Sequence, residues 1–174
     1  MARTKRRAGR CLVGVVMGSD SDLPTMRRCL EMLEKLGIAC EVRVISAHRT
    51  PAEAHEYAAT AAQRGLKVLI AAAGMSAALA GVLAANTTLP VIGVPMAVGP
   101  LAGVDALLST AQMPPGVPVA CMAVGGAGAT NAAIFAAQVL AASDGRLAAK
   151  LRRLKAVQAR EVAKKDAAVR QQGS

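Results

Sequence analysis

The chain has 174 residues, enough for one domain with a buried core, and 53% of them are hydrophobic. It contains no Trp, one Tyr and one Phe, which disfavours a protein that stacks a flavin ring or nucleic-acid bases. The net charge of +10 is concentrated at the ends, because residues 1–10 and 146–174 are strongly basic whereas residues 11–145 hold seven basic and nine acidic groups. This distribution argues against specific nucleic-acid recognition and predicts basic extensions on a near-neutral domain.

Strand-like and helix-like segments alternate along the chain. Strands are expected at residues 12–17, 40–45, 67–72, 89–94 and 117–122, and helices at 23–36, 51–64, 75–85, 104–111 and 129–142. Short loops between such units predict a parallel sheet with helices on both faces. Ligands of these sheets bind beyond the carboxyl ends of the strands, so the loops that begin at Gly18, Ser46, Gly74 and Pro95 are expected at one edge.

Three parts are expected: a disordered basic arm at 1–10, a nucleotide-binding catalytic α/β domain at 11–145, and a basic amphipathic helix with a tail at 146–174. In the last part, leucines at 147, 151 and 154 and a valine at 157 recur at helical spacing. This apolar face is expected to pack on its own subunit or on a neighbouring one.

Membrane insertion and metal binding are both disfavoured. The apolar run at residues 68–85 is just long enough to span a bilayer, but it is rich in Ala and Gly and fits a buried strand followed by a helix better. The four cysteines lack Cys-x-x-Cys spacing and the two histidines lie seven residues apart, so no metal site is expected. With no secretory signal, we expect a cytoplasmic protein with buried, reduced thiols.

The most informative segment is Ser46-Ala47-His48-Arg49-Thr50-Pro51, directly after a predicted strand. Histidine exchanges a proton near neutral pH, and the planar arginine fork binds phosphate or carboxylate. Polar loops after strands are common in any protein, but His48 is the one evident proton carrier in a loop at this edge. It is therefore the candidate acid/base.

Two further loops offer binding groups. Residues 18–22 (GSDSD) join a buried strand to a helix, where free N–H groups and serine hydroxyls favour an anion. Asp22 either caps that helix or accepts a hydrogen bond from a sugar hydroxyl. The small residues after the third strand either admit a flat ligand or serve tight helix–sheet packing, and the loops at 95–103 and 111–116 are expected to shape the pocket.

Taken together, these motifs resemble the N5-carboxyaminoimidazole ribonucleotide mutase family of purine biosynthesis. The resemblance covers about residues 11–145, and its motifs occur in order. They lie at residues 17–22 (MGSDSD), 46–51 (SAHRTP), 90–95 (PVIGVP), 103–109 (GVDALLS), 112–119 (QMPPGVPV) and 131–133 (NAA).

The resemblance implies a three-layer α/β/α flavodoxin-like domain, a homo-octamer joined by the C-terminal helices, and no metal or organic cofactor. It implies as substrate an aminoimidazole ribonucleotide whose exocyclic nitrogen bears a carboxylate, which moves to ring carbon C4 through CO2 held in a closed pocket. By position, Ser19 and Arg49 would bind the phosphate, Asp22 the ribose, and His48 would handle the C4 proton. The other implied substrate-binding residues are Gly18, Ser21, Ser46, Ala47, Gly74, Met75 and Ser76.

One loop departs from the family pattern. Typical bacterial mutases have Gly-Gly-Ala-Ala-His-Leu-Pro-Gly after the third strand, whereas residues 74–81 read GMSAALAG, with Ala78 in the place of the histidine. The related branch that carboxylates aminoimidazole ribonucleotide directly with CO2 also lacks this histidine and resembles the chain in the serine at position 76. That branch has lysine at the place of Arg49, however, and the downstream motifs are mutase-like, so the mutase is the favoured interpretation.

A second alternative comes from another class of protein. The chain could be a non-enzymatic flavodoxin-like binder of a flavin or a nucleotide, although the near absence of aromatic residues disfavours the flavin. Neither a membrane nor a specific nucleic acid is expected as a partner.

Overall fold

The computed structural model describes residues 11–172, which form one five-stranded parallel sheet. The strands are β1 (Val13–Met17), β2 (Cys40–Val44), β3 (Val68–Ala73), β4 (Val91–Pro95) and β5 (Ala120–Cys121). Their spatial order is β2-β1-β3-β4-β5, and each neighbouring pair is parallel. In such doubly wound sheets the ligand site lies where the order reverses, here between β1 and β3. The arm expected at residues 1–10 lies outside the described residues.

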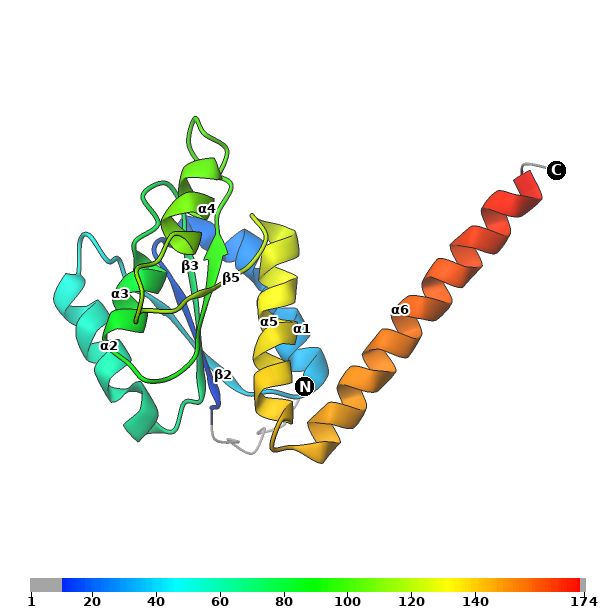
Figure 1. Ribbon diagram of the computed structural model, residues 1–174, viewed down its shortest axis with the longest axis horizontal. Helices are drawn as coiled ribbons and strands as arrows, with labels where there is room; N and C mark the ends of the chain where they lie inside the picture. Colours follow the sequence, from blue (N-terminus) through cyan, green and yellow to red (C-terminus); the bar gives the residue numbers. More distant parts are fainter. Residues whose placement is uncertain (1–10, 173–174) are drawn as a thin grey trace, which may run out of the picture.

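Helices cover both faces of the sheet (Figure 1). The α1 and α5 helices pack on one face, and α2 and α3 pack on the other, which confirms the three-layer α/β/α flavodoxin-like architecture. The helices are α1 (Leu23–Leu36), preceded by a short 3-10 helix η1 (Asp20–Asp22), α2 (Pro51–Arg64), α3 (Leu79–Ala85), α4 (Val104–Ala111), α5 (Gly126–Ala141) and α6 (Gly145–Gln172).

The core is built from small and aliphatic side chains. Every residue of β1 is buried, because helices cover both of its faces. On one face, α5 presents a stripe of fully buried alanines to β3, β4 and α1, and the small side chains allow the helix to approach closely. These alanines are Ala129, Ala132, Ala133, Ala136 and Ala137.

Two predicted elements are shorter than expected. The helix predicted from residue 75 begins at Leu79, because Met75 takes a left-handed backbone conformation with φ of 56° that a helix cannot contain. The strand predicted at 117–122 is reduced to the two residues of β5, an edge strand that follows Pro118, which has no N–H to donate to a ladder. The apolar run at 68–85 is β3 followed by α3, and no helix within residues 11–172 is long and apolar enough to cross a membrane.

The C-terminal helix α6 is anchored at its start and then leaves the domain (Figure 1). Asp144 caps it by accepting hydrogen bonds from the N–H groups of the two residues that follow Gly145. Leu147 is buried against the core, and Lys150 Nζ donates to the Leu36 carbonyl at 2.6 Å. From Lys155 to Gln171 every residue is exposed. The predicted helix therefore packs on its own subunit only near its start, and Val157 is 45% exposed.

Candidate active site

A cavity of about 620 Å³ lies at the carboxyl ends of β1, β2 and β3, where the strand order reverses. This volume is within the range of roughly 300–1,000 Å³ that small-molecule sites occupy. All eleven residues predicted from the sequence line it, so the structure brings three separate loops to one place. The lining residues are Gly18, Ser19, Ser21, Asp22, Ser46, Ala47, His48, Arg49, Ala73, Gly74, Met75, Ser76, Ala77, Ala78, Leu79 and Val98.

The first wall of the cavity is the polar turn after β1. Ser19 occupies the N-cap of η1, where its hydroxyl oxygen accepts hydrogen bonds from the Ser21 hydroxyl at 2.8 Å and from the Ser21 N–H at 3.3 Å. The two hydroxyls thereby lie side by side at the cavity surface. A pair of adjacent hydroxyls at the start of a helix suits an anionic oxygen.

The second wall is the turn that presents His48 and Arg49. Arg49 is held on both sides: its Nε donates to the Ser46 hydroxyl oxygen at 3.3 Å, and its Nη2 donates to the Gly18 carbonyl at 3.3 Å. The guanidinium therefore links the loops after β2 and β1 and keeps further N–H groups for a ligand. Both His48 and Arg49 are exposed, so they are accessible from the mouth of the cavity.

Thr50 does not line the cavity, and the sequence did not single it out, but it closes this turn. Its hydroxyl donates to the Ser46 carbonyl and accepts from the Ser46 N–H, both at 3.1 Å. These bonds fix the backbone on both sides of His48. A threonine directly before the helix-opening Pro51 is the signal that could have indicated this local side-chain-to-backbone bonding.

Asp22 is the buried carboxyl group of the site, with 5% of its surface exposed. It occupies the N-cap of α1, but its side chain makes no capping hydrogen bond, so the capping interpretation considered from the sequence is wrong. Burial raises the pKa of the Asp22 carboxyl, a backbone hydrogen bond from Ser19 partly offsets this, and the charge of Asp20 adds to the rise. A buried acceptor that caps nothing is available to a ligand hydroxyl.

The third wall is apolar and comes from the loops after β3 and β4. Only glycine fits at position 74, because Val98 packs directly against its backbone and a Cβ there would lie 2.1 Å from Val98 Cγ2. Val98 is the one lining residue from the loop at 95–103, which the sequence predicted to shape the pocket, whereas the segment at 111–116 supplies no lining residue. Ala73 at the end of β3 and Ala77, Ala78 and Leu79 after it also line this wall. The small residues that the sequence shows after the third strand therefore do face the cavity.

Within residues 11–172, no three His, Cys, Asp or Glu side chains gather as a metal site would require. All four cysteines are free, but the prediction of buried thiols holds only for Cys29, whose pKa burial raises to about 12. The cavity thus has two polar walls and one apolar wall, and His48 supplies its imidazole group.

The fold and the cavity define a class: a doubly wound α/β protein with a site for an anionic small molecule at the switch point of its sheet. The family model described as AIR carboxylase matches residues 12–161. This chain belongs to that family.

Close relatives and solved structures agree with this assignment. The chain is 55% identical over 140 residues to the N5-carboxyaminoimidazole ribonucleotide mutase of Bacillus subtilis, which covers 80% of this chain and 86% of the relative. It is 52% identical over 155 residues to the mutase of Mycobacterium tuberculosis, covering 89% and 88%. The crystal structure of Treponema denticola PurE superposes with a TM-score of 0.77 at 28% identity and covers 90% of this chain and 96% of that one.

Proposed function

We propose that this chain is an N5-carboxyaminoimidazole ribonucleotide mutase that moves the carboxylate of its substrate from the exocyclic nitrogen to ring carbon C4. Relatives with about half of their residues identical are named for this reaction. The observation on which the mechanism rests is that His48, Arg49 and the Ser19 turn converge on one cavity. The rest of the reaction follows from what these groups can do.

The reaction requires one proton to leave and one to arrive. The bond between nitrogen and carboxylate breaks and releases CO2, the nitrogen gains a proton, C4 attacks the CO2, and the C4 proton departs. Substrate and product contain the same atoms, so the reaction needs no net oxidant, reductant or group donor. His48 accepts the C4 proton and returns one to the nitrogen, as an imidazole can near neutral pH.

The remaining polar groups bind the nucleotide. Arg49 and the Ser19 hydroxyl bind the phosphate, with Ser21, Gly18, Ser46 and Ala47 shaping that end of the site. Asp22 accepts a hydrogen bond from a ribose hydroxyl. The loop of Gly74, Met75 and Ser76 encloses the base. Holding CO2 beside C4 converts a second encounter into a step within one chamber.

Direct carboxylation of the unmodified nucleotide is the second candidate, because Ala78 lines the cavity where the family pattern has a histidine. The mutase is preferred because seven relatives with 47–55% identity over 80–89% of this chain bear that name. It also agrees with Arg49, which binds phosphate with a fork that lysine lacks.

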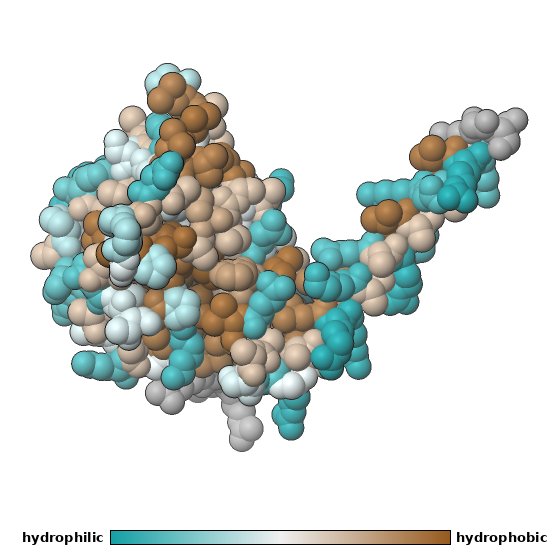
Figure 2. Space-filling view, viewed as in Figure 1, coloured by the Kyte–Doolittle hydropathy of each residue, from teal (hydrophilic) through white to brown (hydrophobic). Residues whose placement is uncertain are grey.

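We further infer that the enzyme acts as a homo-octamer in the cytoplasm. Large apolar side chains are exposed on α4 and on the loop before it, and Figure 2 shows apolar surface gathered there. These residues are Val98, Leu101, Val104, Leu107 and Leu108. Together with the projecting part of α6, they offer a surface for other copies of the chain. Light scattering on the purified protein measures the mass that tests this.

The proposed function is tested by supplying the N-carboxylated nucleotide and monitoring its conversion by NMR of the C4 position. The wild-type enzyme is expected to form the C4-carboxylated product, and His48→Asn to abolish turnover while nucleotide binding stays within several-fold. His55→Asn is the matched control, since His55 is exposed on α2 and does not line the cavity. Retained activity in His48→Asn would remove this residue from proton transfer.

A further inference from the structure

Met75 has an unusual backbone conformation for its residue type. Its φ is 56°, in the left-handed region that normally holds glycine, and Ala102 is the only other non-glycine residue within 11–172 with a positive φ. The Ala77 N–H donates to the Met75 carbonyl at 2.8 Å, which holds the turn. Strained backbone of this kind persists where the surrounding structure imposes it and is concentrated at functional sites.

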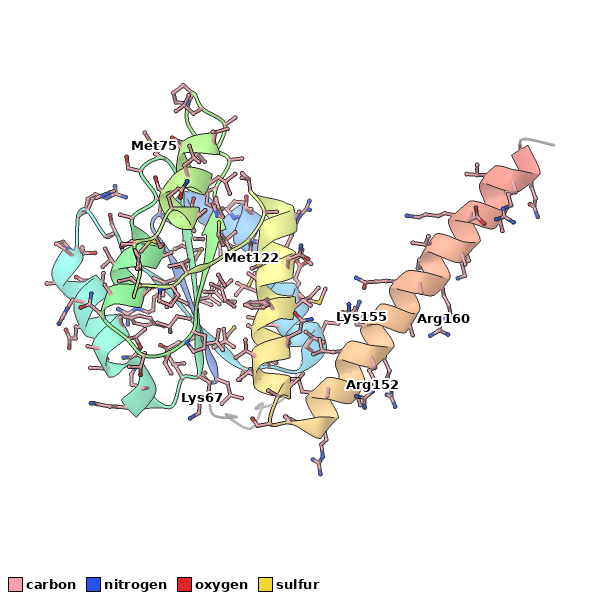
Figure 3. The ribbon with its side chains drawn as sticks, viewed as in Figure 1. Lys67, Met75, Met122, Arg152, Lys155 and Arg160 are labelled. Atoms are coloured by element: carbon pink, nitrogen blue, oxygen red, sulfur yellow. The ribbon has the colours of Figure 1, made fainter. Side chains whose placement is uncertain are left out.

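The side chain of Met75 lies at the mouth of the cavity. It lines the cavity and is nevertheless 56% exposed, and Figure 3 shows it at the end of the domain where α4 lies. A Cβ placed on Gly99 would lie 3.4 Å from Met75 Cγ, so the thioether chain lies against the loop after β4. Val98 from that loop fills the space beside Gly74. Met75 and Val98 thus form a continuous apolar edge made by two loops.

This edge belongs to the apolar side of the cavity. The polar groups that bind a nucleotide come from the loops after β1 and β2, whereas the loops after β3 and β4 contribute alkyl groups and one hydroxyl, that of Ser76. CO2 has no charge and no net dipole, so an apolar surface retains it better than a hydrated one does. Methionine is flexible and adapts its shape to a neighbouring surface.

We propose that Met75 retains the CO2 released during the reaction, by closing the apolar edge of the cavity over the bound nucleotide. The left-handed backbone at residue 75 holds the side chain at the mouth of the cavity, against Gly99 of the loop after β4. This inference rests on the proposed mutase function. Met75 takes no part in bond making; it sets the fraction of CO2 that reaches C4 rather than solvent.

The test measures that fraction directly. The N-carboxylated nucleotide, labelled with 13C in its carboxylate, is converted in excess unlabelled bicarbonate, and the label in the C4-carboxylated product is counted by mass spectrometry. Wild type is expected to keep most of the label. Met75→Gly and Met75→Asn, two residues that accept a left-handed backbone, are expected to lose at least three times more label per product formed.

Ala102→Gly is the matched control, because it relieves the same kind of strain at a residue that does not line the cavity. It is expected to keep the wild-type label fraction. A merely structural role of Met75 would lower the rate without changing the label fraction, so unchanged retention in both Met75 variants would overturn the inference alone. A wild-type enzyme that makes no product from the N-carboxylated nucleotide would overturn the mutase function, and the inference with it.

Discussion

Replacing Arg49 by lysine removes the fork while keeping the charge, and it tests the phosphate site most sharply. The guanidinium has five N–H groups, of which one on Nε and one on Nη2 bind the Ser46 hydroxyl oxygen and the Gly18 carbonyl. The three that remain can meet a phosphate with two parallel bonds. Lysine has no second arm with which to hold both loops and pair with phosphate at once.

The expected loss follows from one charge-assisted hydrogen bond, which contributes about 1.5–3 kcal/mol. Since about 1.4 kcal/mol corresponds to a tenfold change, Arg49→Lys should weaken nucleotide binding by roughly 10- to 150-fold. The folded state should lose little, because Arg49 is exposed and both of its protein hydrogen bonds are long.

Calorimetric titration with the unmodified ribonucleotide and with its dephosphorylated nucleoside measures this effect. The nucleotide should lose affinity for the variant while the nucleoside, which has no phosphate, should bind both proteins alike. Arg64→Lys is a matched control outside the cavity, since Arg64 pairs with Glu41 at 3.1 Å. A less than threefold loss for the nucleotide, or an equal loss for the nucleoside, would refute the assignment of Arg49 to the phosphate.

Three other substitutions test the site. Burial raises the pKa of Asp22 above its ordinary 3.8, so the ionised form is disfavoured in the folded state. The free energy of unfolding is therefore highest, as far as Asp22 is concerned, below pH 3.8, and it falls as pH rises through the raised pKa. Asp22→Asn should therefore raise the melting temperature at pH 7 and not at pH 3.5, and weaken nucleotide binding; a lower melting temperature at pH 7 would contradict this. Gly74→Ala would place a Cβ 2.1 Å from Val98 Cγ2, and denaturant unfolding should show a loss of about 1–3 kcal/mol together with reduced turnover. Thr50→Val removes both bonds to Ser46 and should lower kcat more than it raises KM, with Thr50→Ser restoring kcat. Equal kinetics for the valine and serine variants would exclude a positioning role.

The fold was predictable because the apolar pattern and the turn residues agree. Helices at Leu23–Leu36, Pro51–Arg64 and Val104–Ala111 have the predicted bounds, and prolines or glycines at their ends give the local reason. Where tertiary contacts decide, prediction was weaker. Because Met75 has a left-handed backbone, α3 begins at Leu79 and not at residue 75. The β5 strand is short because Pro118 just before it has no N–H to donate to the sheet.

The cavity was predictable for a different reason. In a parallel sheet the carboxyl ends of all strands meet at one edge, so loops distant in sequence could be placed together without knowing any side-chain contact. The contact between the loops at Val98 and Gly74, and the Asp22 carboxyl that makes no capping hydrogen bond, depend on side-chain geometry that has no sequence pattern. The roles of His48 and its neighbours remain predictions until the variants are measured.

The basic C-terminal part of α6 makes few contacts within one copy of the chain. Figure 3 shows Arg152, Lys155 and Arg160 on the part of α6 that leaves the domain. Most of the stability of a helix in a protein comes from packing of its apolar face. Neighbouring copies of the chain are therefore the expected packing partners of this helix of 28 residues. Removing residues 155–174 should therefore leave the melting temperature of a monomer nearly unchanged, which thermal unfolding measures. It should also lower the number of copies in any assembly, which light scattering gives from the mass.

The most direct test of the mutase reaction is the substrate preference of the wild-type enzyme. The values of kcat/KM are compared for the N-carboxylated nucleotide and for the unmodified nucleotide with saturating bicarbonate, with enzyme-free samples as the blank. A mutase is expected to convert the first and to be nearly inactive with the second. Activity with the unmodified nucleotide and bicarbonate alone would contradict this account and identify a direct carboxylase.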